Sequence, residues 1–148
     1  MKQALRWGLR LGFAAFFLHS GWIKLVDMPA FAESVHRYQL LPLGLVFPGG
    51  LMMAWLEVWA GAALLTLPRL RLAGWAWVLL LLLLFTAAKI SALARGLDIP
   101  CGCGTSTDPM ELRDVIQNFV LIALSAAALR LELRTVSFPQ PQPPETPA

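Results

Sequence analysis

Cysteine is almost absent from this chain. Its 148 residues include only two cysteines, Cys101 and Cys103. A disulfide between such close neighbours would close a very small ring and restrict the unfolded chain little, so it would add little stability. The sequence therefore excludes a fold that depends on disulfide bonds for its stability. If these two thiols pair, the pairing serves chemistry.

Charged residues are also scarce. Only 14% of the residues are charged and 57% are hydrophobic, whereas soluble domains carry about 25% charged residues. A soluble protein of this size must expose much of its surface to water and cannot bury so much apolar surface. The net charge of +3 is small and lies at the ends of apolar segments, where it forms no basic patch. We therefore expect the lipid bilayer as a partner and no nucleic acid.

Four apolar segments have the length of membrane spans. They cover about residues 5–26, 51–67, 72–93 and 112–133, and each is near the ~20 residues that a bilayer core requires. The sequence predicts an all-α fold, an integral membrane four-helix bundle formed by residues 1–134. Residues 135–148 are rich in proline and are predicted to be a disordered tail.

The connector between the first two spans has a pattern of its own. Apolar residues recur at helical spacing in 30–41, which is too short and too polar to cross a membrane. This pattern predicts an interfacial amphipathic helix that lies along the headgroups. Pro42, Pro48 and the pair Gly49-Gly50 are expected to end it and to start the second span.

The distribution of basic residues predicts the orientation. An even number of spans places both termini on one face, and that face carries most of the basic residues: Lys2, Arg6, Arg10, Arg69, Arg71, Arg130 and Arg134. The opposite face carries Arg37, Arg95 and Arg113, with Lys24 near its boundary. Because basic residues favour the cytoplasm, we expect a bacterial inner (cytoplasmic) membrane protein with cytoplasmic termini. The cysteine segment would then face an external, oxidising compartment.

The segment Cys101-Gly102-Cys103 is the strongest chemical feature. The glycine lets the backbone bend so that the sulfurs can meet, and strained, exposed disulfides exchange readily. Nearby Arg95 would favour the reactive thiolate. Cys101 and Cys103 are therefore the predicted catalytic residues. Two alternatives stay open: a soft-metal site for copper or zinc, with His36 as a further ligand, and a pair of unreactive loop cysteines.

Ionisable residues inside the spans form a second candidate group. Glu57 lies in the second span, about seven residues from its predicted outer end, and a carboxylate there is costly. Lys24 and Lys89 lie toward the outer ends of the first and third spans. We predict that Glu57 pairs with Lys24 or Lys89, and that these residues and Arg95 form a polar pocket that supports the cysteines. The structural alternatives are a glutamate that only joins helices and lysines that snorkel to the interface.

These motifs together resemble a known family. Gly21-Trp22-Ile23-Lys24-Leu25 ends the first span, Tyr38-Gln39-Leu40-Leu41-Pro42 follows, and Cys101-Gly102-Cys103-Gly104 comes after the third span. In combination they resemble the MauE branch of the DoxX-like membrane proteins, over about residues 7–130. The resemblance implies a four-span membrane protein associated with maturation of methylamine dehydrogenase, whose small subunit is rich in disulfides.

The function expected from the residues and the resemblance is redox chemistry at the membrane. An exported thiol or disulfide-containing protein, for example a thioredoxin-like one, would exchange with Cys101 and Cys103. The membrane setting and the resemblance make a quinone a candidate electron acceptor, although no quinone motif is visible. Whether the chain is an enzyme, such as a quinone-linked thiol–disulfide oxidoreductase, stays open. A non-enzymatic assembly or transport factor and a metal-handling membrane protein are the alternatives.

Overall fold

The structure, a computed structural model, describes residues 2–66, 68–97 and 112–133. The regular elements in these ranges are helices: α1 (Lys2–Val26), α2 (Met28–Arg37), α3 (Leu43–Leu65), α4 (Pro68–Ala94) and α5 (Leu112–Leu133). All of them except α2 are long and apolar enough to cross a membrane. The chain is therefore a multi-pass all-α membrane protein, and the predicted fold class is confirmed.

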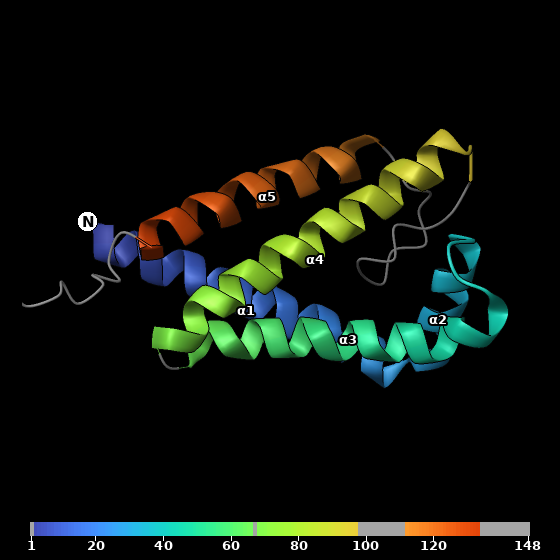
Figure 1. Ribbon diagram of the computed structural model, residues 1–148, viewed down its shortest axis with the longest axis horizontal. Coiled ribbons are helices and arrows are strands. Elements are labelled where there is room, and N and C mark those ends of the chain that lie inside the picture. The colour runs from blue at the N-terminus through green and yellow to red at the C-terminus, as the bar shows by residue number, and fades with distance from the viewer. Residues whose placement is uncertain (1, 67, 98–111, 134–148) are drawn as a thin grey trace, which may run out of the picture.

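The four long helices pack in a defined order. α3 packs against α1 and α4, and α4 also packs against α5 (Figure 1). The start of α1, the turn between α3 and α4 and the end of α5 lie at one end of the bundle, while α2 lies at the other. An ion pair of 3.0 Å between Arg6 and Glu132 joins the start of α1 to the end of α5. Both ends of the described chain therefore lie at the same end of the bundle, as four crossings require.

Close contact between α1 and α3 depends on two glycines. A Cβ added at Gly21 would lie 2.9 Å from the carbonyl oxygen of Ala54, and one added at Gly61 would lie 3.0 Å from that of Ala14. Small residues at such crossings let the two backbones approach, which is how membrane helices gain packing energy without a hydrophobic driving force. The same close approach sets the distance between ionisable side chains on α1 and α3.

Most of each span faces away from the bundle interior. Between 22% and 33% of the residues in the apolar windows of the spans are buried within the protein. The exposed residues include large apolar side chains such as Trp22, Leu43 and Trp59. A water-soluble protein does not expose an apolar surface of this extent, so these faces contact lipid.

The second span begins earlier than the sequence predicts. α3 starts at Leu43 instead of near residue 51, and Pro48 lies inside the helix. Proline removes only one backbone donor there, and the glycines beside it make room for neighbours. A Cβ at Gly49 would lie 3.0 Å from Leu41, and one at Gly50 would lie 3.1 Å from Met28. The predicted helix break was wrong because tertiary packing uses these residues, and as a result Glu57 lies in the middle of α3.

The predicted connector helix is present as α2. The side chain of Asp27 accepts a hydrogen bond from the backbone N–H of Ala30 and caps its first turn. Met28 is buried against α3, whereas Glu33 and Arg37 form an exposed ion pair of 2.6 Å. The hydrogen bond and the positive charge of Arg37 lower the pKa of Glu33. α2 therefore has one face on the bundle and one charged face.

Candidate functional site

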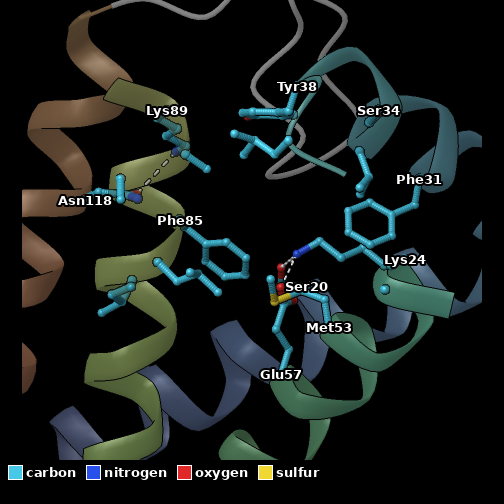
Figure 2. Close-up of a pocket in the computed structure, with 18 of the residues that line it drawn as sticks. Ser20, Lys24, Phe31, Ser34, Tyr38, Met53, Glu57, Phe85, Lys89 and Asn118 are labelled. Carbon is cyan, nitrogen blue, oxygen red and sulfur yellow. Dashed lines mark hydrogen bonds and ion pairs between the residues drawn. The ribbon is translucent and has the colours of Figure 1, made fainter. Parts of the chain in front are cut away.

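A cavity of about 450 Å³ lies at the end of the bundle that holds α2. Its walls come from α1, α2, the segment between α2 and α3, α3 and α4, with one side chain from α5, and they are mostly apolar. As described, α4 has no close backbone contact with α1 or α2. The cavity thus lies where α4 diverges from those helices, and side chains from α1, α2, α3 and α4 line it (Figure 2).

A buried ion pair forms one polar wall of this cavity. The ammonium of Lys24 on α1 donates to Oε1 of Glu57 on α3, and also to the hydroxyl of Ser20 at 3.1 Å. Lys24 is 8% exposed and Glu57 is fully buried. The Lys24 ammonium also lies 5.2 Å from the ring centre of Phe31 and 5.1 Å from that of Phe85. The predicted pairing of Glu57 with a membrane lysine is confirmed, and its partner is Lys24.

The two carboxylate oxygens of Glu57 differ in their hydrogen bonding. Among the described residues, its buried Oε2 has no hydrogen-bond partner. A buried acceptor without a partner costs about 1–3 kcal/mol, and more when it is charged. Glu57 also lines the cavity. The pair therefore presents an acceptor that a ligand with an O–H group could satisfy.

Lys89 on α4 belongs to a second polar cluster. Its ammonium donates to Oδ1 of Asn118 on α5 at 3.3 Å. The amide nitrogen of Asn118 donates to Thr86 at 3.2 Å, and the Thr86 hydroxyl donates to the carbonyl of Leu82 at 2.7 Å. Lys89 and Asn118 line the cavity as well. With Lys24, Glu57 and Lys89 charged, the cavity wall carries one net positive charge.

The structure places Arg95 outside the lining of this cavity. Its guanidinium donates to the backbone carbonyl of Tyr38 at 2.6 Å and to that of Ser91 at 3.1 Å. Gly96 follows with a positive φ of 64°, and the N–H of Leu97 bonds to the carbonyl of Ala92 at 3.1 Å. This is a Schellman ending of α4. In the described structure Arg95 fastens the end of α4 to the end of α2, beside the cavity.

The family of the chain follows from a comparison with family models. The model described as methylamine utilisation protein MauE matches residues 2–131. The chain belongs to the MauE family. This confirms the resemblance found in the motifs and connects the chain with methylamine utilisation. Comparisons with curated proteins and with solved structures found no match.

The two predicted catalytic residues of this MauE-family chain, Cys101 and Cys103, lie outside the described residues. The chain leaves the described structure after Leu97 and returns at Leu112, at the end of the bundle that holds α2. The described residues contain no group of three His, Cys, Asp or Glu side chains that could hold a metal. His36 is exposed on α2.

Sequence reasoning missed several residues of this site. Asn118 had a detectable signal, because an amide inside an apolar span is costly unless it is bonded. Phe31 and Tyr38 belong to the motifs that carry the family resemblance, but that resemblance assigned them no role in a site. Phe85 had no signal, because aromatic residues are common in membrane helices. Ser20 precedes Lys24 by one helical turn, and only the structure shows that its hydroxyl accepts from that lysine.

Proposed function

We propose that this MauE-family protein is a membrane redox protein whose Cys101 and Cys103 alternate between dithiol and disulfide. The observation that carries the proposal is the position of Cys-Gly-Cys. It lies between the third and fourth spans of a chain that belongs to a methylamine-utilisation family. The partner is an exported protein with thiols to oxidise, such as a thioredoxin-like protein or a disulfide-rich subunit of the methylamine pathway.

The chemistry is two successive thiol–disulfide exchanges. A thiolate of the partner attacks one sulfur of the Cys101–Cys103 disulfide, which breaks that bond and forms a mixed disulfide. A second thiolate of the exported protein then attacks the sulfur that this protein already contributes to the mixed disulfide. The partner leaves with a new disulfide, and Cys101 and Cys103 remain as a dithiol. A membrane-soluble acceptor takes two electrons and two protons from this dithiol and restores the disulfide.

The proposed compartment is the external side of a bacterial inner membrane. Support comes from the basic residues at the opposite end of the bundle, where Arg6 and Arg10 lie on α1 and Arg71 lies on α4. Reporter fusions test this orientation. A reporter that is active only outside the cytoplasm should be active when it is fused after Pro42 and inactive when it is fused after Leu133. The reverse pattern would place the cysteines in a reducing compartment and would contradict the proposal.

Trapping of the mixed disulfide tests the proposed reaction. Cys101→Ser and Cys103→Ser each leave one thiol, whose thiolate can attack a disulfide of the oxidised partner and form a mixed disulfide with it. The second cysteine that would resolve this mixed disulfide is missing, so one of the two variants should retain the partner. We expect a larger species on a non-reducing gel that disappears on reduction. The double variant, with neither thiol, is the control. If both cysteines stay free thiols in growing cells and neither variant captures a protein, the proposal is wrong.

A further inference from the structure

We propose that the cavity between α1 and α4 binds a membrane-soluble quinone, whose ring oxygens contact Lys24, Glu57 and Lys89. The binding site rests on the geometry of described residues alone. The role of the bound quinone as the electron acceptor rests on the proposed function. Quinone and dithiol would then give quinol and disulfide, with two electrons and two protons passing from the thiols to the quinone.

The size and the walls of the cavity fit an apolar ligand with a ring. Its volume of about 450 Å³ lies within the roughly 300–1,000 Å³ of small-molecule sites. The cavity lies among helices that are long and apolar enough to span the bilayer, in which an apolar ligand dissolves. Phe31 on α2, Tyr38 after α2 and Phe85 on α4 line it. Such side chains pack against a planar ring from several sides.

The polar groups of the cavity lie on opposite sides. Lys24 approaches from α1 and Lys89 from α4, with the ring of Phe85 between them (Figure 2). Among the described residues, Glu57 and Ser20 accept two of the three N–H groups of Lys24. A third N–H therefore remains for a ligand. A quinone carries carbonyl oxygens on opposite sides of its ring, which matches donors on opposite walls.

The free oxygen of Glu57 distinguishes a quinone from other membrane molecules. A quinol hydroxyl can donate to Oε2, which lacks a partner among the described residues. A fatty-acid carboxylate or a lipid phosphate could pair with Lys24 and Lys89, but in its ionised form it has no proton to donate, so Oε2 would stay without a donor. A hydrocarbon chain would leave the polar groups unsatisfied. A quinone accepts hydrogen bonds in its oxidised form and donates them as a quinol, so it can use the lysines as donors and Glu57 as an acceptor.

Photolabelling of the full chain in lipid nanodiscs tests the proposal. The probe is an azido derivative of a short-chain benzoquinone, and labelled peptides are located by mass spectrometry. We expect label on peptides of α2 and α4 that contain Phe31 or Phe85, and an excess of unlabelled quinone should abolish it. Label spread over lipid-facing positions, or label displaced equally well by oleate, would overturn the proposal.

Matched variants make the test specific. Ala88 lines the cavity, whereas Ala73 on the same helix is exposed outside it. Ala88→Phe should weaken quinone binding at least tenfold because the larger ring occupies the site, and Ala73→Phe should not. Glu57→Gln keeps the shape of the side chain, and it should weaken quinol binding about tenfold, the size expected for a hydrogen bond to a charged group. If Ala88→Phe and Glu57→Gln both bind like the parent protein, the cavity is not the site.

The cysteine variants separate this inference from the proposed function. A chain with both Cys101→Ser and Cys103→Ser should still bind the benzoquinone, because neither residue is needed for the cavity described here. If this variant is labelled but the exchange experiment traps no partner, the quinone site is supported and the proposed dithiol role is wrong. If a partner is trapped but the cavity is not labelled, the dithiol role is supported and the quinone site is wrong.

Discussion

The buried pair of Lys24 and Glu57 gives a prediction with a defined size. Glu57 is fully buried and Lys24 is 8% exposed, so both charges are largely removed from bulk water. Removing one partner of such a pair leaves a buried charge unpaired, which typically costs 3–5 kcal/mol. We expect a loss of about 3–5 kcal/mol in the free energy of unfolding for Lys24→Met, which strands the carboxylate in the middle of α3.

Removal of both charges should reverse most of this loss. Replacing a buried ion pair by apolar residues of similar volume is often neutral or stabilising. The double variant Lys24→Met/Glu57→Leu should therefore be more stable than Lys24→Met alone. Glu57→Leu alone should cost less than Lys24→Met, because Lys24 lies near the end of α1 and its long side chain can reach toward the interface.

The assay is unfolding in mixed micelles, followed by the fluorescence of the six tryptophans. The exposed pair of Glu33 and Arg37 is the matched control, and Glu33→Gln should change the unfolding midpoint little because exposed ion pairs contribute little. Two results would refute the reasoning. In one, Lys24→Met unfolds like the parent protein; in the other, the double variant loses as much as the two single variants together.

Two further variants, each with a control, test the packing of the bundle. Gly21→Ala should destabilise the protein by about 1–3 kcal/mol, the usual cost of overpacking, because its Cβ would lie 2.8 Å from Val58. The control Gly12→Ala, where no atom lies within 4 Å of the added Cβ, should not destabilise it. Equal unfolding midpoints of the two variants would contradict the close α1–α3 crossing. Asn118→Leu should also cost about 1–3 kcal/mol, since it removes an acceptor of Lys89 in the interior of the bundle. Gln117→Leu, at an exposed neighbouring position, should leave thermal stability unchanged, and a similar loss in both variants would argue against the bonded role of Asn118.

The parts of the structure that the bilayer imposes could be predicted from the sequence. A membrane core requires about 20 apolar residues in each helix, so hydropathy alone locates the spans. The cost of an unpaired charge in lipid likewise predicts that Glu57 has a cationic partner. Both predictions depend on the solvent, which is the same for every membrane helix, and not on the details of packing.

The parts that depend on packing could not be predicted. Pro48 and Gly49 have strong local preferences for a break, but in the structure the helix continues through them. Gly49 lies against Leu41 in the loop after α2, and Gly50 lies against Met28 of α2. Lys89 bonds to Asn118 and not to Glu57, because the rotation of α4 and α5 about their axes decides which polar groups meet. The contact of Arg95 with Tyr38 depends on how α4 ends at Gly96, and hydropathy carries no information about that turn.

One measurement tests the central claim most directly. The protein is purified, reduced, placed in nanodiscs and mixed without oxygen with a short-chain benzoquinone, while free thiols and quinol are counted together. The account predicts that the two thiols of Cys101 and Cys103 disappear for each quinol formed, and that Ala88→Phe slows both changes equally. Thiols that persist in the presence of quinone, with no quinol formed, would contradict the account.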